Sequence, residues 1–115
     1  MTSLPERDAR RLRNVAAASG RIANYTALGR ASLDDERTYD AVLRCLTIVG
    51  EALGALSDET YARLPSVPIG LTKQQRNLIV HKYWPVDPEV IWATVERDVP
   101  QLLGDVERVL ARVAT

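Results

Sequence analysis

A periodic line of aliphatic side chains in the C-terminal quarter most strongly limits what this chain can fold into. Its members recur at steps of three or four residues: Ile91, Val95, Val99, Leu102, Val106, Val109 and Val113. Such a step keeps side chains on one face of an α-helix, whereas a strand needs a step of two. The pattern predicts a helix over 88–113, with Asp87 as its N-cap and Pro88 in its first position. Pro100, inside the pattern, predicts a kink or the start of a second segment.

Two long helices are expected upstream. Apolar and small residues at helical spacing predict a first helix over 6–28, which Gly29 ends. A clearer apolar stripe predicts a second helix over 33–56, and Ser32 is the expected N-cap in front of it.

The middle of the chain adds shorter elements. A helical turn over 58–64 precedes a proline-rich loop, and Thr72 is placed to cap a helix that ends at 83 or 84. Phe is absent, and the only aromatic residues are four Tyr and two Trp, which suits helices better than sheets. The fold class is therefore all-α: an antiparallel bundle of four to five helices in one domain, 1–115.

Composition excludes several classes of function. Fifteen basic residues balance fifteen acidic ones, which excludes a uniformly basic nucleic-acid binder but not a local basic patch. One cysteine, Cys45, and one histidine, His81, give no internal disulfide and no Cys/His zinc site within one chain. No apolar run is long enough to span a bilayer, and the N-terminus lacks an apolar signal core. The expected setting is soluble and cytoplasmic.

One segment is locally cationic. Residues 60–86 contain no acidic side chain, but they contain Arg63, Lys73, Arg76 and Lys82. Such a segment suits a phosphate ligand. A solvated helix face that happens to lack acids would give the same pattern, so both interpretations stay open at this point.

Arg76 and His81 have the chemistry needed for RNA transesterification. Histidine is a general acid or base near neutral pH, and the arginine fork stabilises a phosphorane. On a regular helix the two lie about 140° apart, while Asn77 shares a face with His81, and Tyr83 with Arg76. A site across a two-fold interface would bring an arginine and a histidine together from two chains. A purely structural histidine is the alternative.

The motif of these residues resembles a known family. Arg76, His81 and Tyr83 spell R-x4-H-x-Y, and residues 48–52 read Ile-Val-Gly-Glu-Ala. Downstream, a further set follows in order: Asp87, Ile91, Trp92, Asp98 and Pro100. Together these features are similar to the HepT-like ribonuclease toxins, a branch of the HEPN-domain superfamily.

The resemblance implies a specific activity. Members are helical homodimers that cleave RNA at the dimer cleft without metal or cofactor, which implies that Arg76 and His81 are catalytic and that Asn77 supports them. They are toxins paired with an MntA-type nucleotidyltransferase antitoxin. That partner transfers AMP to the motif tyrosine, here Tyr83, and the added bulk and negative charge block the site.

Three positions depart from the family pattern. Gln74 and Gln75 stand where Gly-Met is common, and Lys82 where a glycine is common. Lys82 and Lys73 are candidate RNA-binding residues. The departures also leave an alternative open: a non-catalytic helical dimer that docks a nucleotidyltransferase and binds nucleotide or phosphate.

Glu51 is a candidate supporting residue. It lies beside Gly50 and Gly54, whose spacing predicts close approach of another helix. From there it would orient Arg76 or Asn77. A surface carboxylate without a role is the alternative.

Four arginines share one side of the first expected helix, within roughly 100° at about 100° per residue. We call this the arginine face; it consists of Arg7, Arg10, Arg11 and Arg21. It is suited to guiding RNA or the antitoxin, and a solvated face is the alternative. Tyr25, near the end of the same helix, is interpreted as a packing residue.

Overall fold

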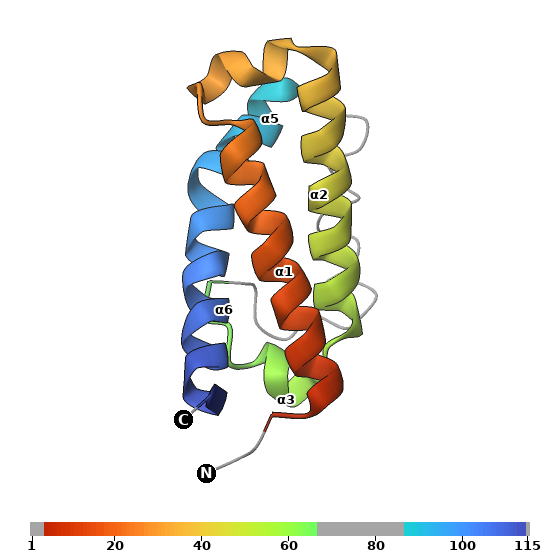
Figure 1. Cartoon of the computed structure of the whole chain (residues 1–115), viewed down its shortest axis with the longest axis vertical. Coiled ribbons are helices and arrows are strands. Elements are labelled where there is room, and N and C mark those ends of the chain that lie inside the picture. The colour runs from red at the N-terminus through yellow and green to blue at the C-terminus, as the bar shows by residue number, and fades with distance from the viewer. Residues whose placement is uncertain (1–3, 67–86, 115) are drawn as a thin grey trace.

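Three long helices form the frame of the molecule (Figure 1). The computed structural model describes residues 4–66 and 87–114. In it, α1 (Glu6–Tyr25) packs on α2 (Glu36–Ala55) on one side and on α6 (Val99–Ala114) on the other. α1 runs opposite to both neighbours, and all regular structure in these residues is helical. The expected all-α fold is confirmed.

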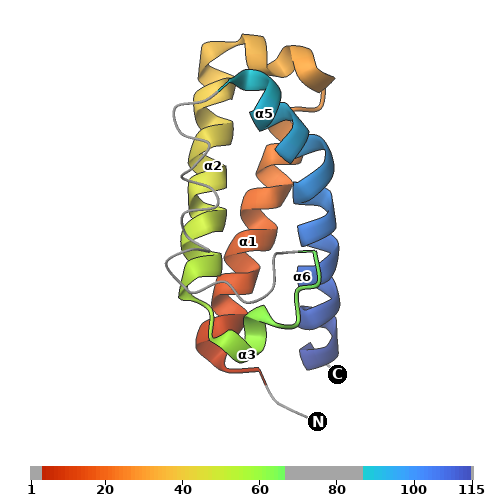
Figure 2. The same cartoon turned by 180° about the vertical axis from the view of Figure 1, so that it is seen from behind.

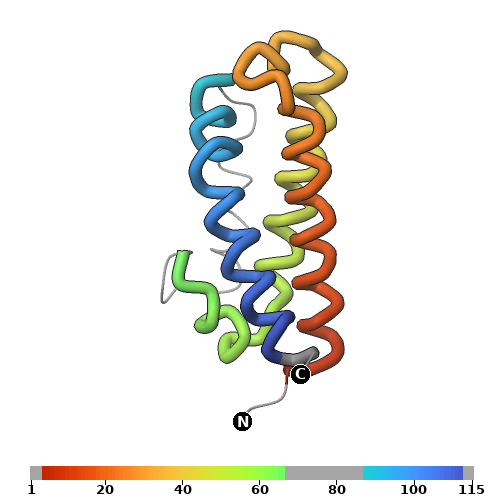
Figure 3. The backbone as a smooth tube through the Cα atoms, turned by 60° about the vertical axis from the view of Figure 1, so that its left-hand side comes forward, coloured from red at the N-terminus to blue at the C-terminus, as the bar shows by residue number. Residues whose placement is uncertain are grey.

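Short elements lie at the two ends of the frame. α3 (Asp58–Tyr61) lies at the end where α1 begins, while the 3-10 helix η1 (Gly29–Asp34) and α5 (Pro88–Ala93) lie at the other end (Figure 2). α5, a π-helical turn η2 (Thr94–Asp98) and α6 follow one another as a single rod along the bundle (Figure 3). Across the described ranges, none of the helices combines the length and apolar content that crossing a bilayer requires.

The predicted C-terminal line of aliphatic residues is buried. Six of its members are at most 7% exposed: Ile91, Val95, Val99, Leu102, Val106 and Val109. They meet a matching stripe on α1 in which Leu12, Val15 and Ala18 are fully buried. Each large aliphatic side chain removed from water in this way contributes roughly 1.5–3 kcal/mol, so this seam is what fixes α6 on α1.

Pro100 divides the last helix, as the sequence predicts. Proline lacks the N–H that would bond the carbonyl of residue 96, and its ring crowds that carbonyl. The chain widens into η2 instead, in which the Val99 N–H donates to the carbonyl of Thr94, five residues earlier. Upstream, the Asp87 carboxylate accepts from the Glu89 N–H at 2.9 Å, so the expected N-cap with Pro88 behind it is confirmed.

Two helices end earlier than expected. α1 ends at Tyr25 with Thr26 as its C-cap, and Gly29, at φ 82°, begins η1 rather than ending α1. α3 is also shorter than expected and ends at Tyr61.

The N-cap of α2 is Asp35, not Ser32. The Asp35 carboxylate accepts from the Thr38 N–H at 2.9 Å and from the Thr38 hydroxyl at 2.8 Å. These hydrogen bonds lower the pKa of Asp35 below its ordinary value. Ser32 lies inside η1 and its hydroxyl is buried, so it is not placed to cap the following helix.

A buried carboxylate joins α1 to α3. Asp8 is 1% exposed and accepts from the hydroxyls of Ser57 and Thr60, each at 2.6 Å, and from the Ser57 N–H at 3.3 Å. Burial raises the pKa of Asp8, but the hydrogen bonds outweigh it and leave this pKa below the ordinary value. The start of α1 and the N-cap of α3 therefore depend on one ionised side chain.

Candidate functional site

Most of the residues predicted for the site lie outside the described ranges. Arg76, Asn77, His81 and Tyr83, together with Lys73 and Lys82, all fall within 67–86, so their roles stay predictions. Glu51 is the predicted site residue that the structure places. The site is therefore built here from Glu51 and from the contacts that fix the chain on either side of 67–86.

Glu51 lines a groove of about 220 Å³ between α1 and α2. α1 contributes Arg11 and Asn14, and α2 contributes Ile48, Glu51 and Ala52. Glu51 is exposed, whereas Ala52 is buried at the contact with α1. The groove thus has an apolar floor, a cation and an amide on one wall, and a carboxylate on the other.

Arg11 has a buried hydrogen-bond donor without an acceptor among the described residues. Its Nη1 atom is shielded from solvent and has no hydrogen-bond acceptor in the part of the chain that the structure describes. Within the same ranges, neither Arg11 nor Glu51 forms an ion pair. A buried donor without a partner costs about 1–3 kcal/mol, and a carboxylate or phosphate oxygen would relieve it. The groove is therefore suited to an anionic group.

Sequence reasoning placed Arg11 on the arginine face but missed its position in a groove with Glu51. The signal available was weak: residues 11 and 14 share one side of α1, and residues 48, 51 and 52 share one side of α2. The register between the two helices decides that these sides meet, and it depends on packing.

The chain is fixed to α6 immediately before residue 67. The Ser66 N–H donates to the Asp105 carboxylate at 2.8 Å, and the Ser66 hydroxyl donates to the same oxygen. Asp105 is 3% exposed, and its other oxygen pairs with Arg108. A buried carboxylate on α6 thus holds the point where the chain leaves the described frame.

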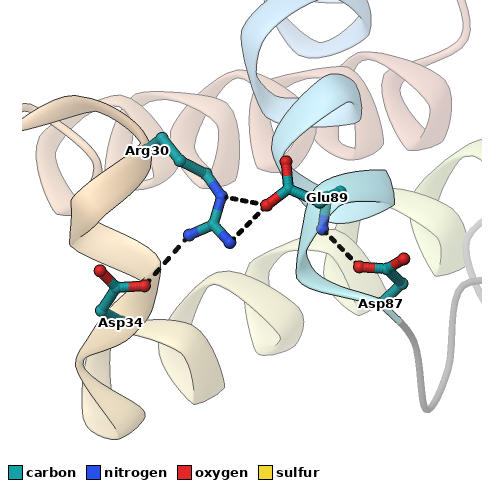
Figure 4. Close-up of polar contacts among 4 residues, drawn as sticks. All are labelled: Arg30, Asp34, Asp87 and Glu89. Carbon is teal, nitrogen blue, oxygen red and sulfur yellow. Dashed lines mark hydrogen bonds and ion pairs between the residues drawn. The ribbon is translucent and has the colours of Figure 1, made fainter.

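The chain is fixed again immediately after residue 86. Asp87 caps α5, and Glu89 in the first turn of α5 accepts from Arg30 (Figure 4). Arg30 also donates to Asp34 at 3.2 Å, so η1 and α5 share one guanidinium. The segment that contains the predicted catalytic residues therefore starts and ends at two polar anchors.

Fold and groove together define a small all-α protein whose antiparallel helices α1 and α2 form a groove with an unpartnered arginine donor. This chain belongs to the HepT-like family: the family model described as "Ribonuclease HepT-like" matches residues 7–109. The match contains the R-x4-H-x-Y motif at 76–83 and Glu51. The predicted family membership is confirmed.

Individual relatives agree with the family match. The chain is 36% identical over 76 residues to a protein of Thermococcus cleftensis named "Probable ribonuclease HepT", covering 66% of this chain and 69% of that protein. It is also 36% identical over 67 residues to a protein of Methanocaldococcus jannaschii named as a candidate RNase, covering 58% and 62%. The matches thus span about two thirds of the relatives' lengths. No solved structure matches the chain.

Proposed function

We propose that this protein is the toxin of a toxin–antitoxin system and acts in the cytoplasm as a metal-independent endoribonuclease. The observation that carries the proposal is the family match over 7–109, with the complete R-x4-H-x-Y motif inside it. The relatives named as ribonucleases support the same reaction. The buried Nη1 donor of Arg11, in the groove that Glu51 also lines, has no acceptor among the described residues and is compatible with a polyanionic substrate.

In the proposed reaction, the 2′-hydroxyl of RNA attacks the adjacent phosphorus while His81 takes its proton. Arg76 stabilises the negative charge of the phosphorane, and Asn77 supports the pair. The bond to the 5′-oxygen breaks, and that oxygen gains a proton from the histidine of a second copy. The products are a 2′,3′-cyclic phosphate and a free 5′-hydroxyl. This route needs a homodimer, with a composite site at its cleft.

Regulation in this proposal acts through Tyr83. An MntA-type nucleotidyltransferase antitoxin binds ATP, and the phenol oxygen of Tyr83 attacks the α-phosphorus. Pyrophosphate leaves and the phenolic proton passes to a base on the partner. The attached AMP brings bulk and negative charge next to a site that must bind RNA phosphate, so it blocks binding both sterically and electrostatically.

Cleavage of RNA in EDTA by purified, unmodified protein tests the proposal. We expect the wild type to cleave, and Arg76→Ala and His81→Ala each to lose cleavage while keeping the helical circular dichroism spectrum. Cleavage that survives both substitutions would show that the activity does not come from this motif.

Glu51 is tested in the same assay. If Glu51 orients Arg76 or Asn77, Glu51→Gln lowers cleavage by about tenfold, since a carboxylate orients a guanidinium or an amide more strongly than a neutral amide does. Glu59→Gln is the matched control, because Glu59 is also an exposed glutamate but lies outside the groove. Equal cleavage by Glu51→Gln and the wild type removes Glu51 from the site.

A second candidate function follows from Gln74, Gln75 and Lys82, which depart from the family pattern. It is a non-catalytic dimer that docks the nucleotidyltransferase and binds nucleotide. Calorimetry with ATP and with a short RNA separates the two functions: tight ATP binding without RNA turnover favours the second.

A further inference from the structure

We propose that the arginine face of α1, together with the groove against α2, is a binding track for the phosphate backbone of the RNA substrate. The proposal rests on the proposed function for the identity of the substrate. It adds a binding surface made of described residues that lie outside the predicted catalytic motif.

The arginine face is exposed near both of its ends, and the small residues Ala17 and Ala18 separate Arg21 from the other three arginines. Arg7, Arg10 and Arg21 are exposed, while Arg11 is half-buried in the groove. Asn14 lies among them on the same side of α1. From residue 7 to residue 21 the face is about 21 Å long at about 1.5 Å per residue, which is enough to face several consecutive phosphates.

The acidic residues of α1 do not neutralise this face. Glu6 lies four residues before Arg10, but its carboxylate pairs with Arg13 at 3.0 Å. Asp8 is buried and accepts its hydrogen bonds from Ser57 and Thr60. The nearby Arg7 guanidinium also lowers the pKa of Asp8, but among the described residues none of the four arginines forms an ion pair, so the face keeps a net positive charge although the whole chain is neutral.

The groove between α1 and α2 adds further hydrogen-bond donors to one side of the track. Arg11 and Asn14 offer N–H donors there, and Nη1 of Arg11 has no acceptor among the described residues. On α2, Arg44 precedes Ile48 by one turn and Glu51 by two, so it lies on the same side of that helix and is exposed. Glu51 is the single carboxylate among the five lining residues. Arg11 and Arg44 thus contribute two positive charges at the groove against the one negative charge of Glu51.

An exposed aromatic side chain lies at the outer end of the track. Tyr25, four residues after Arg21 on the same side of α1, is 40% exposed and is not the packing residue that the sequence suggested. Exposed aromatic rings beside a basic groove are typical stacking platforms for single-stranded bases. Protein interfaces are centred on large apolar or aromatic side chains, whereas the middle of this face holds only the small residues Ala17, which is exposed, and Ala18, which is buried. The surface therefore suits RNA better than a protein partner.

Fluorescence anisotropy with a fluorescein-labelled 20-nucleotide 2′-O-methyl oligouridine tests the track. This probe lacks the 2′-hydroxyl, so wild-type protein binds it without cleaving it. The track variant combines Arg7→Gln, Arg10→Gln and Arg21→Gln. The control variant combines Arg13→Gln, Arg97→Gln and Arg112→Gln, which removes the same charge from other exposed positions.

We expect the track variant to bind at least tenfold more weakly than the control at low salt. We also expect the slope of log affinity against log salt to fall by about 2, since each phosphate contact to a single strand contributes about 0.7. Tyr25→Ala weakens binding about fivefold or more, and Tyr25→Phe restores it, because stacking needs the ring and not the hydroxyl. Equal losses in the track and control variants overturn the proposal, since net charge alone would then explain them.

The outcomes separate this inference from the proposed function. A wild type that binds the probe through the track but cleaves no RNA in EDTA upholds the track and removes the nuclease. If instead the wild type cleaves RNA, and the track and control variants bind the probe equally, the nuclease is upheld and the track is overturned. Unchanged RNA affinity in a track variant that no longer binds the antitoxin also overturns the proposal and makes the face a protein-docking surface. Circular dichroism and thermal melting confirm that each variant folds.

Discussion

Arg30 and Glu89, fifty-nine residues apart in the chain, are joined by two hydrogen bonds to one carboxylate oxygen, 2.8 Å from Nε and 2.6 Å from Nη2. The hydrogen bond with Glu89 raises the pKa of Arg30 above its ordinary value. Because Glu89 lies in the first turn of α5, this contact fixes where the chain re-enters the frame after residue 86. The pair is therefore a positioning element for the segment with the predicted catalytic residues.

Separating this pair is expected to reduce activity more than stability. Arg30→Ala and Glu89→Ala each lower RNA cleavage several-fold, while thermal melting changes little, because exposed ion pairs contribute little to folding. The charge-swapped variant Arg30→Glu/Glu89→Arg recovers most of the cleavage. Single variants that cleave like the wild type, or a swap that recovers nothing, would show that the contact has no positioning role.

Asp8→Ala is expected to destabilise the fold by about 2–4 kcal/mol. The substitution removes the acceptor from one buried donor on Thr60 and from two part-buried donors on Ser57, and it takes away the link between α1 and α3. Urea unfolding followed by circular dichroism measures the loss. Glu6→Ala is the matched control, since Glu6 is an exposed acid in the same helical turn, and it should cost less than about 1 kcal/mol.

The same carboxylate predicts how stability depends on pH. Burial raises the pKa of Asp8, but the hydrogen bonds from Ser57 and Thr60 lower it by more than burial raises it. The pKa of Asp8 is therefore below its ordinary value in the folded state. Its stabilisation is then fully present above the unfolded pKa of about 3.9 and is lost as the pH falls through the folded value. We expect urea midpoints to fall below pH 4 in the wild type and to fall less steeply in Asp8→Asn. Parallel curves for the two proteins would contradict this role.

Two glycines give opposite predictions for one substitution. A Cβ added at Gly20 or at Gly29 meets no atom within 4 Å, so both sites have room. Gly20 lies within α1, and Gly20→Ala is expected to stabilise the fold by about 0.5–1 kcal/mol. Gly29 has φ 82°, and Gly29→Ala is expected to destabilise it by about 1–2 kcal/mol. Thermal melting of both variants tests the pair, and shifts of the same sign would contradict it.

The sequence predicts the fold best where all the residues that determine a helix lie within that helix. The aliphatic line from Ile91 to Val109 shows the helical period directly, and all six of its described members are buried. Asp87 and Pro88 are likewise adjacent residues with local preferences for the start of a helix. These features need no knowledge of the rest of the molecule.

Features that depend on competition or on distant contacts were predicted less well. Ser32 and Asp35 are both good N-caps, and Asp35 caps α2 because its carboxylate reaches Thr38. The position of Arg11 opposite Ile48 depends on the register of α1 against α2, and no pattern within either helix contains that register. The catalytic assignment depends on the family motif, because on one regular helix Arg76 and His81 do not share a face.

The packing of α1 against both α2 and α6 has a consequence for biosynthesis. α1 is synthesised before α2 and α6, so each of these two helices finds its packing partner already present. α2 is complete about 30 residues after α1, roughly 2–6 s at common elongation rates of about 5–20 residues/s. A nascent chain would thus form a helical hairpin early and keep the other apolar side of α1 uncovered until α6 has been made. Synthesis of α6, rather than of the first two helices, then completes the core.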